Sequence, residues 1–438
     1  MNADLSTLLF VGVVAILTAT AALVLLVRGD LAPAGSGRGT PTGHGRWFLG
    51  AALGVGVIAF TLKVIIILIL ANFPNQTVAP LIADVGKIAP AGNFEIDVGM
   101  QEPLAFKALP AVAPAPPENP TTPEKVALGE RLFHDTALSH DGTVSCASCH
   151  DVDCGVGNDG RPTAVGITGI PGKRNSPTVF NAAFQARLFW DGRAASLEEQ
   201  AMGPPLNPDE MGMPNAAAIE TRIAAEPSYR RAFAAVFGTD EPISLRRIVQ
   251  AIAAYERTLI TADTPYDRFV GGDLNALSPA QRRGMGLFQS IGCVICHSGP
   301  NFSGASLIGP KNPYAPLMAH RSQYALSHDL RADTGKAATA DGDGIWRIPS
   351  LRNVALTAPY FHNGQVNDLH EAVRVMATSQ LNALISDDPH PRQTFTWSSE
   401  RGTYATVSRI VLDSRDVDDL VAFLNGLSSD RLAARASR

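Results

Sequence analysis

The chain has 438 residues, of which 45% are hydrophobic and 18% charged, and its 36 basic and 41 acidic residues give a net charge of −5. This length suggests two or three domains, and the composition suits a globular protein with some membrane-embedded chain. No basic run is long enough to follow a phosphate backbone, so nucleic acid is not expected as a partner.

The first 71 residues predict a transmembrane helical hairpin. Residues 5–27 form an uncharged, almost wholly apolar run that is long enough to span a membrane as a helix, and a second apolar run follows at 47–71. A signal peptide fits less well, because Asp4 lies where such a peptide would carry positive charge. The arginine-bearing loop between the runs should face the cytoplasm. We therefore expect an anchor in a bacterial inner membrane, with the rest of the chain in the periplasm.

A tether is predicted between this hairpin and the body of the protein. Residues 72–120 show no sustained periodicity and end in a Pro-rich stretch, which is typical of a semi-extended linker. A helix then starts at Thr122-Pro123, with Thr as N-cap and Pro at the first helical position.

A five-residue motif occurs twice, as Cys146-Ala-Ser-Cys149-His150 and as Cys293-Val-Ile-Cys296-His297. Two thiols at this spacing can form thioethers to the haem vinyl groups, and the adjoining His can then ligate the iron. A zinc site would need a closed set of four ligands, and an oxidoreductase C-x-x-C does not require the His. The pattern predicts two covalently bound haem c groups. It leaves Cys154 as an odd thiol, for which burial is the commoner fate.

The surroundings of the two motifs suggest an internal duplication. A second capped helix starts at Ser278-Pro279, with Gln281 in the capping-box position, and Leu287-Phe288 precedes the second motif as Leu132-Phe133 precedes the first. Further amphipathic helices are expected around Ile248 and around Leu420, the latter capped by Ser414. Weak strand signals and abundant Gly and Pro predict a mainly α fold of two tandem cytochrome c-like haem domains with long loops, at 121–270 and 271–430.

Two further segments show a family resemblance when they are taken together with the motifs. One runs from Arg174-Asn-Ser-Pro-Thr178 through Leu188-Phe-Trp-Asp-Gly-Arg to Asn207-Pro-Asp-Glu-Met211, and the other is Pro349-Ser-Leu-Arg-Asn-Val-Ala-Leu-Thr-Ala-Pro-Tyr-Phe-His362. With both motifs, they closely resemble the bacterial dihaem cytochrome c peroxidase family, which includes the methylamine-dehydrogenase maturation enzyme MauG. The resemblance spans roughly residues 121–428 and does not cover the hairpin or the tether.

The resemblance implies a division of labour between the haems. The haem on His150 would be peroxidatic, with Gln200 and Glu210 over its iron, because cleavage of the peroxide bond requires a proton to move between its oxygens. The haem on His297 would transfer electrons.

Three further roles follow from matching positions. Trp190 matches a tryptophan between the haems, and Met376 matches the second ligand of the electron-transfer haem, although a helical Met is usually a core residue. Asn175, with the carbonyl oxygens of Thr357 and Pro359, matches an interdomain site whose oxygen ligands suit Ca²⁺.

One departure from the family pattern concerns the loop after the first motif. Many dihaem peroxidases carry a histidine there that blocks the peroxidatic iron until the other haem is reduced. Ile167 falls at this point, and no His occurs from Asp151 to Met211. The peroxidatic haem should therefore be five-coordinate in the resting protein, as in the maturation-enzyme branch.

These expectations favour a membrane-anchored periplasmic peroxidase that reduces hydrogen peroxide to water with electrons from a cytochrome c or a cupredoxin. One alternative is MauG-like oxidation of a protein or organic substrate. Another is a non-enzymatic dihaem electron-transfer subunit of a membrane complex. The partners compatible with the sequence also include a second copy of the chain.

Overall fold

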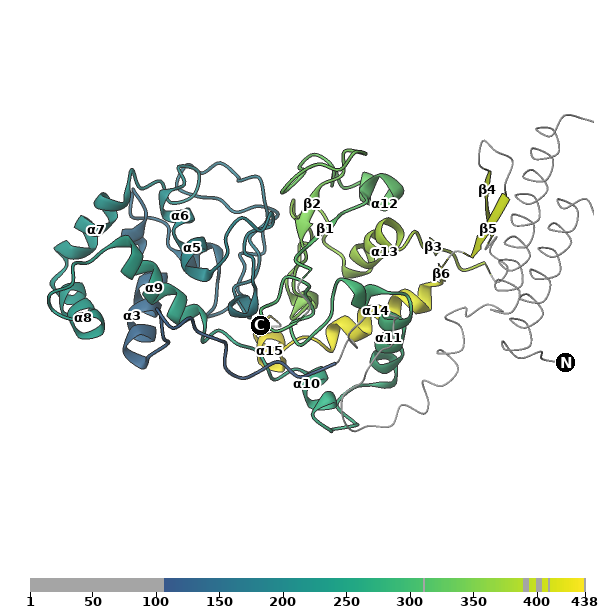
Figure 1. The fold of residues 1–438 in the computed structure, drawn as a ribbon, viewed down its shortest axis with the longest axis horizontal. Coiled ribbons are helices and arrows are strands. Elements are labelled where there is room, and N and C mark those ends of the chain that lie inside the picture. Colours follow the sequence, from purple (N-terminus) through teal and green to yellow (C-terminus); the bar gives the residue numbers. More distant parts are fainter. Residues whose placement is uncertain (1–105, 310–311, 389–393, 399–403, 409, 437–438) are drawn as a thin grey trace, which may run out of the picture. The chain divides into compact units, whose positions relative to one another are not determined.

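The computed structural model of the chain describes residues 106–309, 312–388, 394–398, 404–408 and 410–436 (Figure 1). The predicted hairpin and most of the predicted tether lie outside these residues. Among the helices that are described, none combines the length and the apolar character needed to cross a membrane.

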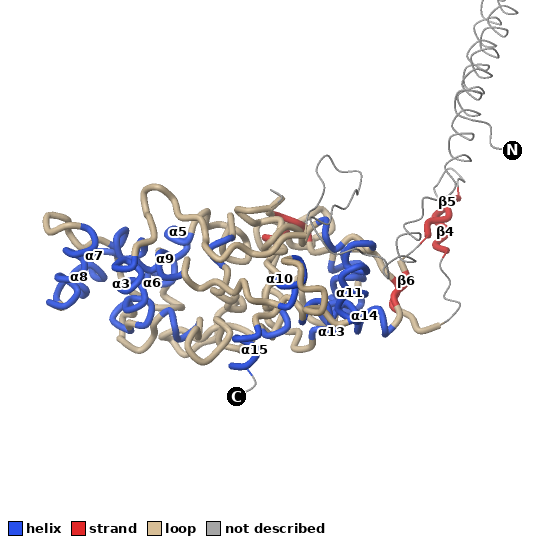
Figure 2. The backbone as a smooth tube through the Cα atoms, turned by 90° about the horizontal axis from the view of Figure 1, so that it is seen from below, coloured by secondary structure: helices blue, strands red, loops and turns tan. Residues whose placement is uncertain are grey.

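The described chain is mainly helical, which confirms the mainly α part of the predicted fold class, and long loops separate the helices (Figure 2). The helices are α3 (Pro123–His134), α4 (Cys146–Cys149), α5 (Leu197–Ala201), α6 (Gly203–Leu206), α7 (Ala216–Ala225), α8 (Pro227–Phe237), α9 (Leu245–Glu256), α10 (Pro265–Val270), α11 (Pro279–Ser290), α12 (Gln323–Leu326), α13 (Leu369–Gln380), α14 (Ser414–Asn425) and α15 (Asp430–Ala436). Antiparallel ladders join β1 (Tyr314–Pro316) to β2 (Ile345–Arg347) and β4 (Thr394–Ser398) to β5 (Tyr404–Ser408), and a parallel ladder joins β3 (Leu384–Ile385) to β6 (Val411–Leu412).

The helix starts follow the capping signals in the sequence. Thr122 caps α3 with Pro at the first turn, and Ser278 and Gln281 form the expected capping box of α11. The prediction for α14 was wrong by one residue, because Asp413 rather than Ser414 is its N-cap. The Asp413 carboxylate accepts the amide of Asp416 at 2.8 Å in a reciprocal capping box, which leaves Ser414 as the first helical residue.

The described chain has two lobes, the first built on α3 and α9 and the second on α11 and α14. In each lobe the two helices cross at a glycine. A Cβ on Gly129 of α3 would lie 1.9 Å from the carbonyl oxygen of Ala251 in α9, and a Cβ on Gly284 of α11 would lie 1.8 Å from that of Asp419 in α14. Only glycine allows backbones to approach this closely. Both glycines lie three residues before a Leu-Phe pair, so the internal duplication includes the helix crossing.

The boundary between the lobes differs from the sequence estimate. Tyr266 and Phe269 of α10 pack into the core of the second lobe, although the estimated boundary followed this helix. The C-terminal helix α15 returns to the first lobe, where Leu432 is buried in the core and Arg435 donates to the carbonyl of Val152 at 2.7 Å.

Residues 106–120, the described end of the predicted tether, lie against both lobes. Phe106 packs into the core of the second lobe, and the amide of Leu109 donates to Asp267 at 2.8 Å. The buried Asn119 donates to Glu198 at 2.7 Å and to the carbonyl of Gln250 at 2.9 Å in the first lobe. This stretch is therefore part of the folded body.

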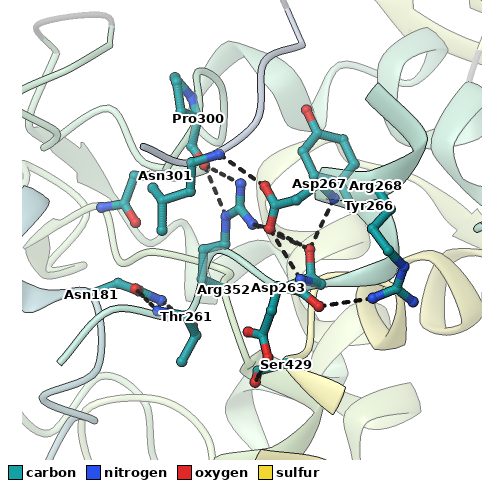
Figure 3. Close-up of polar contacts among 12 residues, drawn as sticks. Asn181, Thr261, Asp263, Tyr266, Asp267, Arg268, Pro300, Asn301, Arg352 and Ser429 are labelled. Atoms are coloured by element: carbon teal, nitrogen blue, oxygen red, sulfur yellow. Dashed lines mark hydrogen bonds and ion pairs between the residues drawn. The ribbon is translucent and has the colours of Figure 1, made fainter. Parts of the chain in front are cut away.

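A buried polar network ties the lobes together (Figure 3). Asn181 donates to the hydroxyl of Thr261 at 2.7 Å, and Asn353 donates to the same hydroxyl at 2.9 Å. Asn181 accepts the amide of Thr261, while Asn353 accepts that of Ser429. Both asparagines lie four residues after a proline and adopt a left-handed backbone, with φ of 64° and 60°. The duplication therefore reappears where the lobes meet.

Candidate active site

The first Cys-x-x-Cys-His motif forms the short helix α4, which begins after Ser145. The ring of His150 uses Nδ1 toward the carbonyl oxygen of Gly157 at 3.3 Å, so Nδ1 is the protonated nitrogen and Nε2 is available as a ligand. Burial lowers the pKa of His150, which favours the neutral ring that metal binding requires. The donor set at this motif fits a covalently attached haem with His150 as axial ligand.

The second motif repeats this arrangement. His297 is buried and places Nδ1 3.2 Å from the carbonyl oxygen of Phe302, and burial lowers its pKa to about 4. Hydrogen bonds of this kind fix the orientation and tautomer of metal-ligating histidines.

A cavity of about 290 Å³ opens beside the second motif. Cys293, Cys296 and His297 line it on one side, and Met376 lines it from α13 together with Ala372, Val373, Ala377 and Gln380. Their three- and four-residue spacing puts these positions on one face of the helix. His297 and Met376 thus border the same space, as the axial ligands of one haem must.

Replacing Met376 with alanine is expected to convert a six-coordinate, low-spin haem into a high-spin one and to lower its reduction potential, because a His/Met pair raises that potential. Electron paramagnetic resonance and a redox titration of the holoprotein would measure both effects. Met318→Ala is the matched control, since Met318 is outside the cavity lining. Retention of both low-spin signal and potential by Met376→Ala would show that Met376 is not the ligand.

Trp190 lies where the lobes meet. Its indole N–H donates to the carbonyl of Asn175 at 2.9 Å, and its own carbonyl accepts the amide of Arg347 from the second lobe at 3.0 Å. The ring is half-buried and lines the same cavity as His297. An indole held in this way can carry an electron between the lobes while filling their interface.

Glu210 is half-buried in a turn that folds back onto α6. The amide of Met211 donates to the carbonyl of Pro204 at 3.3 Å, and one Glu210 carboxylate oxygen accepts from Asn207 at 2.7 Å. Burial raises the pKa of Glu210, against the opposing effects of Asn207 and Arg193. Its charge also acts on the first motif, because burial, with smaller contributions from the carboxylates of Asp159 and Glu210, raises the pKa of Cys149 to about 11.

Gln200 lies on α5, which the hydroxyl of Ser196 caps by accepting the amide of Glu199 at 3.1 Å. Its side chain is half-buried. Because α6 directly follows α5, the turn that folds back onto α6 places Glu210 near the segment that carries Gln200. The roles of Gln200, Glu210 and Trp190 stay predictions.

The loop after the first motif packs against the Glu210 turn. The amide of Ile167 donates to the carbonyl of Glu210 at 2.9 Å, and a Cβ on Gly166 would lie 2.2 Å from the carbonyl oxygen of Asp209. The Ile167 side chain in turn lies against Gly212. Ile167 therefore occupies this loop with an apolar side chain that cannot ligate iron, in line with the expected five-coordinate haem.

The predicted calcium ligands lie on the two sides of the interlobe junction. Asn175 donates its amide N–H to the carbonyl of Arg161 at 2.9 Å, and its backbone amide donates to the carbonyl of His362 at 2.7 Å. Thr357 and Pro359 line the same cavity as Asn175. Among the described residues, no cluster of three or more His, Cys, Asp or Glu side chains is placed to hold a metal ion. Calcium binding through amide and carbonyl oxygens stays a prediction.

Two features near the junction were not predicted from the sequence. Trp346 stacks on His362 with ring centroids 3.9 Å apart, and both line the cavity. Arg174 binds Asp191 of its own lobe and Asp333 of the other, each at 2.7 Å. The sequence offered one signal for the stack, because Trp346 lies just before the segment that begins at Pro349 and ends at His362.

The expected burial of Cys154 was wrong, because its side chain is exposed. The carboxylate of Asp151 accepts the amide of Asp153 at 3.1 Å and that of Cys154 at 2.9 Å. These bonds fold the chain into a tight turn at the surface, which turns the thiol toward solvent.

Comparison with known proteins agrees with this arrangement. The family model described as di-haem cytochrome c peroxidase matches residues 123–275. The chain is 39% identical to the cytochrome c peroxidase Ccp of Escherichia coli K12 over 72% of its own length and 61% of that protein, and 36% identical to the cytochrome c551 peroxidase of Pseudomonas aeruginosa over 75% and 85%. A crystal structure of a MauG-like protein associated with microbial copper homeostasis superposes with a TM-score of 0.58 at 32% identity, covering 74% of this chain and 95% of that one.

Proposed function

Because the chain belongs to the di-haem cytochrome c peroxidase family, we propose that it is a membrane-anchored, periplasmic peroxidase that reduces hydrogen peroxide to water with electrons from a small redox protein. The observation that carries this proposal is the contrast between the two motifs. Glu210, a half-buried carboxyl with a raised pKa, contributes to the raised pKa of Cys149 in the first motif. Met376 lines the cavity beside the second motif.

Bound haem c supplies one iron centre at which peroxide is cleaved and a second that takes up and passes on electrons. The protein's part at the first centre is to hold it through Cys146, Cys149 and His150 and to move a proton. Glu210, oriented by Asn207, takes the proton from one peroxide oxygen and returns it to the other, so that the departing oxygen leaves as water. Complete reduction of one peroxide consumes two electrons and two protons and gives two waters.

The protein's part at the second centre is electron transfer. His297 and Met376 would hold the iron of a bound haem at a potential suited to accepting electrons, and Trp190 lines the same cavity at the junction with the first lobe. Ile295, between the two cysteines of the second motif, is 54% exposed and offers an apolar contact for a cytochrome c or a cupredoxin. Stopped-flow mixing of the resting holoprotein with peroxide tests the proposal, since a first haem that does not react with peroxide would refute it.

The proposed location of the protein depends on residues outside the described part of the chain. The two apolar runs at 5–27 and 47–71 support a membrane hairpin, and covalent haem attachment suits the periplasm. Fractionation of cells, followed by protease treatment of spheroplasts, is expected to find the chain in the membrane and its haem lobes accessible from outside. A chain recovered in the soluble fraction would contradict the anchor.

The interlobe calcium ion is a separate part of the proposal, supported by Asn175, Thr357 and Pro359. Removing calcium with a chelator is expected to slow electron transfer between the lobes, because these ligands bridge the junction beside Trp190. Restoration by Ca²⁺ and not by Mg²⁺, measured as the rate of reduction of the first haem, would support the site. An unchanged rate after complete chelation would contradict it.

A second candidate function is peroxide-dependent oxidation of a protein or organic substrate, as in MauG. The Ile167 loop favours it, because an open first haem is also expected in the maturation-enzyme branch. Met376 counts against it, since that branch uses a tyrosine on its second haem. Turnover of peroxide with reduced cytochrome c as the sole donor separates the two functions.

A further inference from the structure

Arg347 is a buried cation whose charge is not matched by a carboxylate. The residue is 5% exposed, at the end of β2. Its Nε donates to the carbonyl of Phe189 at 2.9 Å and its Nη1 to that of Ile348 at 3.5 Å, while Nη2 has no partner among the described residues. The carboxylate that acts on it, Asp191, is already bound by Arg174 and Arg193.

The other buried arginines are different. Arg352 is 2% exposed and binds Asp267 at 2.6 Å (Figure 3), and Arg257 is 6% exposed and binds Glu198. Buried charges in proteins are normally paired, because an unpaired one loses its hydration without compensation. Burial lowers the pKa of Arg347 only to about 10, so the guanidinium is still charged at neutral pH.

The position of Arg347 indicates which carboxylate could pair with its guanidinium. Arg347 lines the same cavity as His297, Met376 and Trp190. A haem attached to Cys293 and Cys296 has its vinyl edge at the cysteines and its two propionates at the opposite edge. Since Ile295 between those cysteines is exposed, the propionate edge of a haem attached there would lie deeper in the cavity, which Arg347 also lines.

We infer that Arg347 binds a propionate carboxylate of the haem held by Cys293, Cys296 and His297. A guanidinium and a carboxylate form short, charge-assisted hydrogen bonds, and Nη2 is the donor left free for them. The same residue also holds the backbone that carries the interlobe tryptophan, because its Nε donates to the carbonyl of Phe189 and its backbone amide to that of Trp190. Arg347 is therefore a positioning residue that links the propionate edge of this haem to Trp190.

A buried positive charge beside a haem stabilises its reduced form, so Arg347 raises the reduction potential of the His297 haem. A redox titration of the holoprotein is expected to give a lower potential for this haem in Arg347→Met, with Arg347→Lys close to the wild type and the potential of the His150 haem unchanged. Arg321→Met, at an exposed arginine, is the matched control and should leave both potentials in place.

A crystal structure of the wild-type holoprotein gives an independent measurement if Arg347→Met does not fold. Nη2 within hydrogen-bond distance of a propionate oxygen would support the inference. A chloride or phosphate ion on Arg347, both propionates bound elsewhere, or an unchanged potential in Arg347→Met would overturn it. The titration involves no peroxide, so its outcome is independent of whether the protein is a peroxidase.

Discussion

Replacing Glu210 with glutamine is expected to lower the rate of peroxide reduction by about 10²- to 10⁴-fold, the range that a positioned acid or base contributes to catalysis. Glutamine keeps the size of the side chain and can still contact Asn207, but it cannot take up a proton and return it. Binding of peroxide should persist, so the loss should fall on cleavage of the peroxide bond.

The pH dependence of the wild-type protein follows from the same carboxyl group. Burial raises the pKa of Glu210 above its ordinary value of 4.5. Glu210 must start as the carboxylate in order to accept a proton, so turnover should fall as the pH drops through this raised pKa. The acidic limb of the profile should therefore lie above pH 4.5 and should disappear in Glu210→Gln.

Rapid mixing of each holoprotein with peroxide at a series of pH values measures both effects. Glu199→Gln is the matched control, because Glu199 is an exposed carboxylate on α5 that accepts the amide of Ala195 at 2.7 Å. The haem content and the spin state of both irons should be the same in all three proteins. Wild-type cleavage rates in Glu210→Gln would remove Glu210 from the mechanism.

The local features of the fold could be predicted from the sequence because neighbouring residues determine them. The cap at Thr122, the capping box at Ser278 and the two haem motifs depend on contacts within a few residues. Gly129 and Gly284 could also have been found, since each lies three residues before a Leu-Phe pair, and the duplication implied that both helices cross a partner in the same way.

The interlobe junction could not be predicted from the sequence. The stack of Trp346 on His362, the ion pair of Arg174 with Asp333 and the unpaired guanidinium of Arg347 join residues that are brought together only by the tertiary fold. The exposure of Cys154 depends on which backbone amides donate hydrogen bonds to the Asp151 carboxylate. A general preference for buried cysteines does not contain that information.

The largest loss of stability is expected when Asp267 is replaced with asparagine. The Asp267 carboxylate accepts from Arg352 at 2.6 Å (Figure 3). It also accepts from the hydroxyl of Thr264 at 2.7 Å and from the amide of Leu109 at 2.8 Å, and the ion pair is buried. Asparagine leaves the charge of Arg352 uncompensated and points an N–H group at donors. Removing one partner of a buried ion pair typically costs about 3–5 kcal/mol.

Chemical denaturation of the holoprotein, followed through both the haem absorbance and the far-ultraviolet circular dichroism, measures this loss in the free energy of unfolding. Asp430→Asn is the matched control, because its pair with Arg268 spans 2.8 Å but its side chains are 63% and 44% exposed, and such pairs contribute about 1 kcal/mol or less. An Asp267→Asn protein no less stable than Asp430→Asn would show that the Arg352 pair does not hold the lobe together.

The pH dependence of the free energy of unfolding provides a second test of the ion pair between Asp267 and Arg352. Burial alone would raise the pKa of Asp267, but Arg352 and Thr264 lower it below its ordinary value. The contribution of the pair is therefore complete above the pKa of an unfolded aspartate, about 3.9, and is lost as the pH falls through the lowered pKa of the folded state. The asparagine side chain of the variant cannot titrate, so Asp267→Asn should lose this part of the acid sensitivity. Because the amide of Leu109 donates to the same carboxylate, the same titration should also weaken the contact of residues 106–120 with the second lobe.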